Sequence, residues 1–176
     1  MIPGLATRRS FTELSEQEIL ALAISSEEDD ARIYRSYGER LRKDYAASAA
    51  LFDAMAEEED THRRWLIERH RARFGEVIPL IRREHVAGFY ARKPVWLMEN
   101  LSLDKMRAEA EAMERSAAAF YLRAARQTSD AETRKLLGDL AAAEARHEKK
   151  AGDLTDQHLG DDTRSEEDRA AHRQFV

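Results

Sequence analysis

The sequence contains the same short pattern twice: a glutamate followed three residues later by a histidine, each time within a run of helix-forming residues. The first copy is Glu59-x-x-His62 and the second is Glu144-x-x-His147. Residues three apart lie on the same face of an α-helix, so the carboxylate and imidazole of each copy can approach one ion. Helical bundles that bind two metal ions carry this pair on two helices and add a glutamate from each of the other two. The pattern therefore favours a metal-binding helical bundle, provided that two further helices supply glutamates.

The composition predicts an all-α protein with one domain. Charged residues make up 36% of the 176 residues and hydrophobic residues 43%, with only seven Gly and three Pro. This balance is typical of long helices, and the length is sufficient for an independent core. We expect an N-terminal arm at residues 1–15, a helical bundle at residues 16–158, and a polar tail at residues 159–176 that links to a further domain.

Several classes of protein and site are excluded or made unfavourable by the composition. The chain has no cysteine, which excludes disulfides, thiolate zinc sites and cysteine-ligated iron–sulfur centres. Its net charge of −5 gives no basic surface for nucleic acid, so we expect no nucleic-acid partner. No run approaches the roughly 18 apolar residues of a membrane span, so we expect this chain by itself to be cytosolic.

Two long helices are predicted in the first half of the chain. Ser15 followed by Glu18 forms a capping box that opens a helix from about Glu16 to Lys43. A second helix is expected from about Tyr45 to Phe74, followed by Gly75 as a natural terminator.

The apolar stripe of each of these helices is interrupted by polar side chains. Glu27 lies in the stripe of the first helix, and Glu59 with His62 lies in that of the second, whereas Asp29 and Asp30 are expected to face solvent. Because an unpaired carboxylate in a core is costly, the inward phase of these residues predicts a shared partner. We expect Glu57 and Glu58, beside this stripe, to be exposed. The stripe positions are Leu20, Ile24, Glu27, Ala31, Tyr34, Gly38, Leu41 and Tyr45 in the first helix, and Leu51, Met55, Glu59, His62 and Leu66 in the second.

The connection at residues 76–101 is long and apolar, which is unusual for a structureless loop in a compact domain. We expect a helical crossover between the second and third helices, broken near Pro79 and Pro94. Its apolar residues between Val77 and Met98 favour an interface, and we expect a homodimer formed through them. His85 remains unassigned.

Two further helices complete the predicted antiparallel four-helix bundle. Ser102 is expected to cap the third, which runs to about Gln127. Ser129 with Glu132 forms a second capping box for the fourth, which runs to about His158.

These helices supply the remaining candidate ligands. Glu111 and Glu114 lie one turn apart beside the stripe of the third helix, and the second Glu-x-x-His pair lies in the stripe of the fourth. The two halves are also related internally, because Tyr34 and Tyr121 each follow a candidate glutamate by seven residues. Together the four helices offer five carboxylates and two imidazoles: Glu27, Glu59, His62, Glu111, Glu114, Glu144 and His147.

Five buried carboxylates repel one another unless protons or cations compensate them. Two divalent ions would reduce the net charge of such a site to near −1, with bridging glutamates and one histidine for each ion. Oxygen-rich ligation of this kind fits iron or manganese, with zinc as a further possibility. Two irons can together deliver two electrons to dioxygen or peroxide.

The run from Ala143 to Lys149 resembles the last metal-binding helix of rubrerythrin. The paired glutamates of the third helix, the first Glu-x-x-His pair, and Glu27 with Tyr34 match the other metal segments of that family. The resemblance extends from about residue 16 to residue 158 and implies a ferritin-like fold with metal ligation by all seven candidates. Alignment on Ala31-Arg32 would select Glu28 instead of Glu27, but only Glu27 is in phase with the apolar stripe.

Two features depart from rubrerythrin: there is no rubredoxin module, and the connection between the second and third helices is longer. The runs from Ile24 to Tyr34 and from Arg83 to Tyr90 resemble the erythrin domain of membrane-bound ferritin. In that family the domain precedes a membrane part similar to the vacuolar iron transporter, and the whole protein resembles iron exporters of bacterial inner membranes. The resemblance therefore implies a C-terminal membrane transporter domain and tethering to the inner membrane.

Three functions are compatible with these observations. The first is a cytosolic di-iron domain that captures ferrous iron for a membrane exporter, with or without oxidising it. The second is a stand-alone peroxidase or ferroxidase of the rubrerythrin type. The third is a metal-free helical interaction domain whose acidic residues are solvated.

Overall fold

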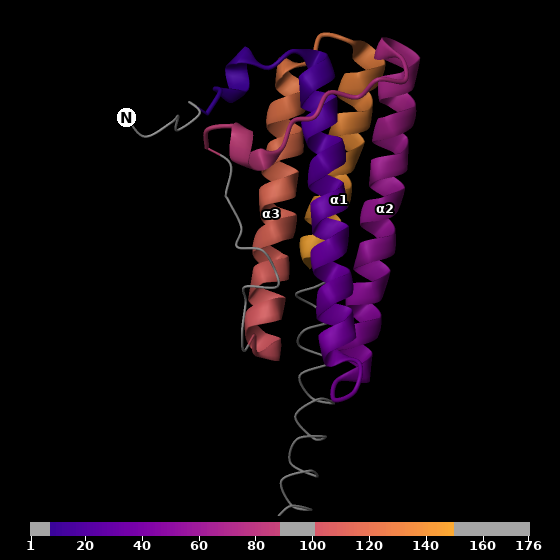
Figure 1. Ribbon diagram of the computed structural model, residues 1–176, viewed down its shortest axis with the longest axis vertical. Helices are drawn as coiled ribbons and strands as arrows, with labels where there is room; N and C mark the ends of the chain where they lie inside the picture. Colours follow the sequence, from indigo (N-terminus) through magenta and orange to yellow (C-terminus); the bar gives the residue numbers. More distant parts are fainter. Residues whose placement is uncertain (1–7, 89–100, 150–176) are drawn as a thin grey trace, which may run out of the picture.

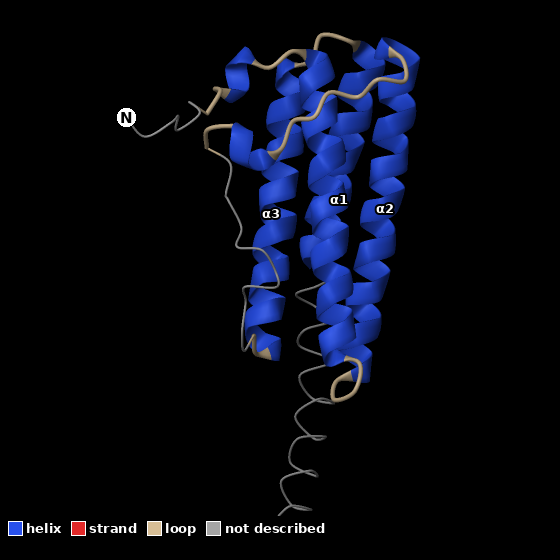
Figure 2. Cartoon of the chain, viewed as in Figure 1, coloured by secondary structure: helices blue, strands red, loops and turns tan. Residues whose placement is uncertain are grey.

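The computed structural model describes residues 8–88 and 101–149, and the regular elements of this part of the chain are helical (Figure 2). Three long helices are α1 (Glu16–Leu41), α2 (Ala46–Phe74) and α3 (Leu103–Gln127), and a further α-helix occupies residues 131–149 of the described chain. Two short 3-10 helices, η1 (Phe11–Glu13) and η2 (Arg83–His85), lie outside them. The predicted all-α fold is confirmed. None of the helices in the described residues combines the length and apolar character needed to cross a membrane.

The predicted helix boundaries of the first three helices are confirmed to within two residues, and their caps explain why. Ser15 accepts a hydrogen bond from the backbone N–H of Glu18, whose carboxylate accepts in return from the backbone N–H of Ser15. Gly75 ends α2 with a φ of 86°, a left-handed conformation that favours glycine. Ser102 caps α3 through the backbone N–H of Lys105.

The start of the helix at residues 131–149 differs by one residue from the prediction. Asp130 is its N-cap, because its Oδ2 accepts hydrogen bonds from the backbone N–H of Thr133 at 2.9 Å and the hydroxyl of Thr133 at 2.7 Å. Ser129 instead donates its backbone N–H and its hydroxyl to Glu16 at the start of α1. The expected capping box of Ser129 with Glu132 is wrong. Aspartate is as good an N-cap residue as serine, and Ser129 forms its hydrogen bonds with Glu16 of α1 instead.

The helices form an antiparallel bundle whose two halves are joined by a long crossover (Figure 1). At one end of the bundle, the side chain of Gln127, the last residue of α3, donates to the backbone carbonyls of Phe11 and Leu14, just before α1. At the same end, Arg69 near the end of α2 pairs with Asp130 at the start of the last helix. Because α2 and α3 both end here, α3 begins at the opposite end of the bundle (Figure 1).

The described part of the crossover, residues 75–88, lies across α1 and contains only η2 as regular structure (Figure 1). Ser25 donates its hydroxyl to the carbonyl of Ile81 at 2.7 Å, and the buried side chains of Ile81 and Val86 join the core. Val86 also forms an isolated parallel bridge with Arg9, which ties the crossover to the N-terminal arm. The rest of the predicted helical crossover, including residues 89–98 of the proposed dimer face, lies outside the described residues.

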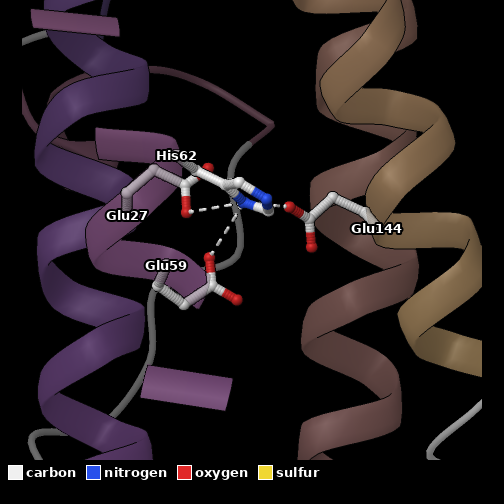
Figure 3. Close-up of side chains that lie close together, drawn as sticks. All are labelled: Glu27, Glu59, His62 and Glu144. Atoms are coloured by element: carbon white, nitrogen blue, oxygen red, sulfur yellow. Dashed lines mark ion pairs between the residues drawn. The ribbon is translucent and has the colours of Figure 1, made fainter. Parts of the chain in front are cut away.

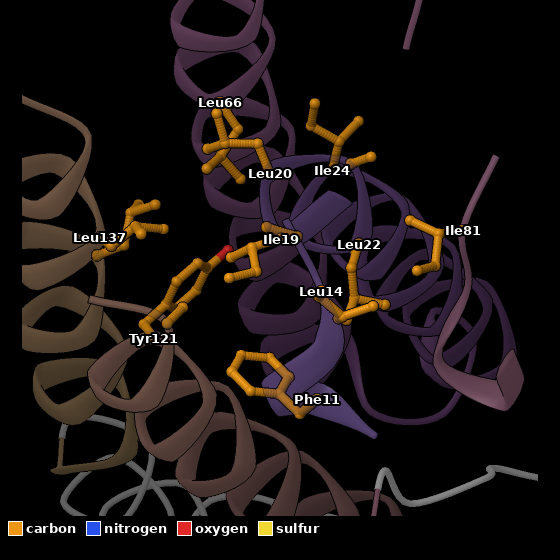
Figure 4. Close-up of a cluster of buried hydrophobic side chains, with 14 of the residues drawn as sticks. Phe11, Leu14, Ile19, Leu20, Leu22, Ile24, Leu66, Ile81, Tyr121 and Leu137 are labelled. Carbon is orange, nitrogen blue, oxygen red and sulfur yellow. The ribbon is translucent and has the colours of Figure 1, made fainter. Parts of the chain in front are cut away.

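The buried side chains fall into two apolar clusters separated by a polar layer. The first cluster lies at the end where α1 begins and includes Phe11, Ile19, Leu66 and Leu137 (Figure 4). The second lies toward the opposite end and is formed by the following side chains: Tyr34, Tyr37, Leu41, Ala49, Phe52, Met55, Ala56, Met106, Ala110 and Met113. Along each helix the candidate metal ligands lie between or beside the residues of these clusters, so the apolar packing fixes their positions.

Asp30 was expected to face solvent, and this expectation is wrong. Its side chain is buried and pairs at 2.7 Å with Arg83 from η2, and this guanidinium also donates to the backbone carbonyl of Ser26. Asp29, by contrast, is partly exposed and pairs with Arg82. The crossover therefore supplies a cation that allows a second acidic residue of α1 to be buried.

The pair of Arg83 and Asp30 generates a prediction for stability. Replacing Arg83 by alanine removes the cation that pairs with the buried carboxylate of Asp30, so the free energy of unfolding should fall by about 3 kcal/mol or more. The matched control is Arg82→Ala, which removes an exposed pair and should cost about 1 kcal/mol or less. Urea denaturation of both variants tests this, and equal losses would contradict the role given to Arg83.

Candidate metal centre

Six of the seven predicted ligands converge in the polar layer between the two apolar clusters. The four helices each contribute at least one of them, and the four carboxylates are almost completely buried, with 1 to 3% of each residue exposed. His62 is also buried, and His147 is partly accessible. The converging residues are Glu27 of α1, Glu59 and His62 of α2, Glu114 of α3, and Glu144 and His147 of the last helix.

These side chains form two overlapping groups, each able to surround one ion. Glu27 and His62 join Glu59 and Glu144 in the first group, and all four potential ligand atoms lie within 4.8 Å of one another. In the second group the same two glutamates join Glu114 and His147, within the same distance. Two adjacent positions that share two carboxylates and hold one histidine each are what a two-metal centre requires.

Both imidazoles take part in contacts between the two halves of the bundle. The Nδ1 atom of His62 lies 2.8 Å from Oε1 of Glu144, which reaches across from the opposite pair of helices (Figure 3). The same nitrogen lies 3.7 Å from Oε2 of Glu59 and 3.9 Å from Oε2 of Glu27. The ring of His147 stacks on that of His62, with 5.8 Å between ring centres and 8° between planes.

Two buried tyrosines fix the orientation of the outer glutamates. Tyr34 of α1 donates to Oε1 of Glu114 at 2.7 Å, and Tyr121 of α3 donates to Oε1 of Glu27. Each tyrosine therefore holds a glutamate of the opposite half rather than the one seven residues before it. Burial raises the pKa of both phenols well above the usual value, so both are neutral donors at physiological pH.

Several ligand atoms have no hydrogen-bond partner among the described residues. The contact between His62 Nδ1 and Glu144 Oε1 is close but lacks the alignment of a hydrogen bond. Buried polar atoms are nearly always satisfied, and a group of unsatisfied atoms facing one space fits a bound cation. The atoms concerned are Oε2 of Glu27, Nδ1 of His62, Oε2 of Glu114, and Oε1 and Oε2 of Glu144.

Burial suppresses part of the charge of the metal-free site. It raises the pKa of Glu27 to about 7 and that of Glu59 well above the usual value. The charge of Glu27 raises the pKa of Glu59 further. Burial, followed by the charge of His147, lowers the pKa of His62 to about 4, so this imidazole is neutral and free to bind a metal. Metal binding must therefore displace protons from carboxyl groups.

The pKa values of Glu114 and Glu144 are shifted in opposite directions. Burial and then the adjacent Glu114 carboxyl raise the pKa of Glu144. Burial also raises the pKa of Glu114, but the nearby side chains of His147 and Glu144 and the hydrogen bond from Tyr34 outweigh it, so the net pKa is lowered. In the metal-free state Glu144 is thus the protonated partner and Glu114 the ionised one.

Two of the sequence-based alternatives can be compared with the structure directly. Glu27 is buried in the first group, whereas the side chain of Glu28 is 41% exposed and pairs with Arg32 on the same helix. This placement favours Glu27. Glu111 is half-buried and belongs to neither group, so its role as a ligand stays a prediction.

Sequence reasoning missed one functional contact. Glu58 was expected to be an exposed neighbour, and its side chain is 43% exposed, yet its Oε2 lies 2.6 Å from Nε2 of His147. A histidine that binds a metal through one nitrogen usually donates its other N–H to an acceptor, so an additional acid beside a Glu-x-x-His pair was the available signal.

Comparisons with known proteins agree with this geometry. The sequence pattern of a protein family described as Rubrerythrin matches residues 18–155. Among solved structures, a hypothetical protein from Pyrococcus furiosus has a TM-score of 0.66 and 23% sequence identity, covering 85% of this chain and 94% of that chain. At this identity the similarity concerns the fold alone. No curated protein matches the chain.

The raised pKa of Glu27 generates a prediction for the metal-free protein. The unfolded chain loses this proton near pH 4.5 and the folded chain near pH 7. Between these values the folded state binds one more proton, so the contribution of Glu27 to the free energy of unfolding should fall by about 1.4 kcal/mol per pH unit.

Urea denaturation with a chelator present, from pH 5 to pH 7, measures this slope. In Glu27→Gln the free energy of unfolding should fall less steeply with pH, by about 1.4 kcal/mol per pH unit. In Glu28→Gln the slope should be unchanged. His62 opposes the trend below about pH 6.5, because its lowered pKa favours folding as the pH rises. The comparison of variants cancels that contribution, and identical slopes in Glu27→Gln and the wild type would contradict the assignment.

Proposed function

The chain belongs to the rubrerythrin family, and from this premise we propose that its buried cluster binds two iron ions and oxidises ferrous iron. The observation that supports this most strongly is the overlap of the two groups of ligand atoms. Both groups contain Glu59 and Glu144, and each adds one glutamate and one histidine of its own. A single metal position would not need two separate histidine-containing groups joined by shared carboxylates.

The donor set fits the proposed ions. Glu59 and Glu144 would be shared by the two irons, since they belong to both groups; Glu27 and His62 would help to hold one ion, and Glu114 and His147 the other. The unsatisfied buried atoms of these residues are acceptors, which suits a hard or borderline cation with oxygen-rich ligation. Manganese matches the same donors, and zinc is a weaker fit because no cysteine is available.

The protein residues control protons and access, and irons held by them would supply paired electrons for dioxygen or peroxide. Glu144 and Glu59 release protons when cations enter, because burial keeps them protonated in the metal-free state. Tyr34 and Tyr121 keep one oxygen of each outer glutamate fixed, so the other oxygen is left for a cation. The apolar clusters on both sides exclude bulk water.

We further propose that this domain passes iron to a membrane exporter. The support is the resemblance of residues 24–34 and 83–90 to the erythrin domain of membrane-bound ferritin. In that arrangement the bundle would lie in the cytoplasm, tethered to the bacterial inner membrane through the chain after residue 158. Self-association belongs to the same proposal, and it is supported by the exposure of Val77 and Leu80, at 82% and 84%. A stand-alone peroxidase is the alternative, since it would use the same ligands.

Metal content tests the ligand assignment. Protein reconstituted with ferrous iron without oxygen should carry about two irons per chain. Glu59→Gln and Glu144→Gln should each carry less than one, because each variant removes a ligand shared by both positions. Glu28→Gln, an exposed change near the site, should carry the full amount.

Elemental analysis after desalting gives the result, and thermal unfolding of the metal-free variants serves as the folding control. The two glutamine variants should be no less stable than the wild type, since a buried acid is replaced by a neutral isostere. Full iron loading in either of them would refute its bridging role.

The proposed reaction predicts oxidation without storage. Ferrous iron added in air should be oxidised by the wild type faster than in buffer, and Glu144→Gln should lose this excess rate. A single bundle encloses no volume for a mineral, so iron beyond the bound pair should not stay soluble with the protein. Absorbance of the ferric product and gel filtration with iron analysis follow both outcomes.

Two results would change the proposal. If fully iron-loaded protein oxidises no ferrous iron above the buffer rate, the oxidase function fails and binding alone remains. If steady turnover of peroxide with an added electron donor greatly exceeds the rate of iron oxidation, the peroxidase alternative is favoured.

A further inference from the structure

We propose that Glu58 orients and polarises His147, and that it thereby makes the metal position on the His147 side the tighter of the two. This inference rests on the proposed two-metal site and adds a difference in affinity between its two metal positions. It concerns a residue that belongs to neither group of potential ligands.

The geometry of His147 separates its two nitrogens. Nδ1 lies 3.7 Å from Oε2 of Glu114 and 3.9 Å from Oε2 of Glu144, so it is directed into the cluster. Nε2 lies on the other side of the ring, 2.6 Å from Oε2 of Glu58. The N–H group is therefore assigned to Nε2, where it donates to the carboxylate, and the lone pair to Nδ1, where it is available to a metal.

The chain around Glu58 places it for this role. It precedes the bridging residue Glu59 on α2, and its partner His147 lies on the last helix, so the contact joins the two halves of the bundle at the rim of the site. Its side chain is 43% exposed, against almost complete burial for the four ligand carboxylates. The carboxylate of Glu58 is therefore in contact with both solvent and the imidazole of His147.

His62 lacks the equivalent partner. Its Nδ1 faces the cluster, but within the described ranges no hydrogen bond or ion pair is found at its Nε2. Its ring instead lies beside Trp65, with 5.7 Å between ring centres. The two histidines thus differ at Nε2: that of His147 has a carboxylate beside it, and within the described residues none is found beside that of His62.

A carboxylate that accepts the N–H of a ligand imidazole makes the ring a stronger donor and holds it in one orientation. Loss of such a partner typically weakens metal binding by about 10- to 100-fold. Because only one of the two positions has this support, the first metal ion should bind on the His147 side, and the second should bind more weakly beside His62.

The test is a titration of the metal-free protein with Co²⁺, whose visible absorption reports coordination. The wild type should take up two ions in two steps of different affinity. Glu58→Gln keeps the size of the side chain but removes its charge, so it should weaken the first step by about 10-fold or more and leave the second little changed. Glu58→Ala should weaken the first step further.

The matched control is Glu57→Gln, an exposed neighbour on the same helix, which should leave both steps unchanged. NMR of the Co²⁺-loaded protein adds a readout that a purely structural role would not move. The shifted N–H signal of the His147 ring should exchange slowly with water in the wild type and faster in Glu58→Ala.

The outcomes distinguish this inference from the proposed function. If the wild type binds no Co²⁺ at the cluster, the two-metal site itself fails, and the role of Glu58 fails with it. If the wild type binds two ions but Glu58→Gln leaves both steps unchanged, or weakens both equally, the two-metal site stands and the inference about Glu58 is wrong.

Discussion

The main physical constraint on this protein is a layer of buried acidic side chains in the middle of a helical bundle. Four carboxylates in near-complete burial repel one another, and the surrounding structure reduces that repulsion in several ways. Protons remain on the carboxyls whose pKa is raised, Tyr34 and Tyr121 donate to the outer glutamates, and Arg83 neutralises the nearby Asp30. The apolar clusters then supply the packing energy that holds such a layer together. Metal affinity and metal-free stability are opposed in this arrangement, since the same buried charges favour one and weaken the other.

Helical periodicity was sufficient to predict the bundle and most of the centre. Glu27, Glu59 and Glu144 were in phase with apolar stripes, and the structure brings them together because a helix cannot turn one member of its stripe outward without turning the rest. Caps were also readable, since Ser15 and Ser102 act on residues three positions away. These features depend on contacts that are local in sequence.

The errors for Asp30 and Ser129, and the contact of Glu58 that was missed, share one cause, which is contact between distant segments. Asp30 is buried because the crossover after α2 returns an arginine to it, and no pattern within α1 indicates that. Ser129 is drawn away from its expected cap by Glu16, more than a hundred residues earlier. Glu58 was judged by its own helix alone, although its partner lies on the last one. An apolar stripe indicates which face of a helix is buried, but it does not indicate which side chains of other segments pack against that face.

The exchange of tyrosines between the two halves has a consequence for how the protein matures. Each half carries a glutamate that accepts a hydrogen bond from the phenol of the other half, so neither helical hairpin alone contains the full set of contacts around these carboxylates. The final arrangement of the buried carboxylates therefore forms only when both hairpins have packed together. The hydrogen bonds of Tyr34 and Tyr121 thus couple the order of these side chains to the completion of folding.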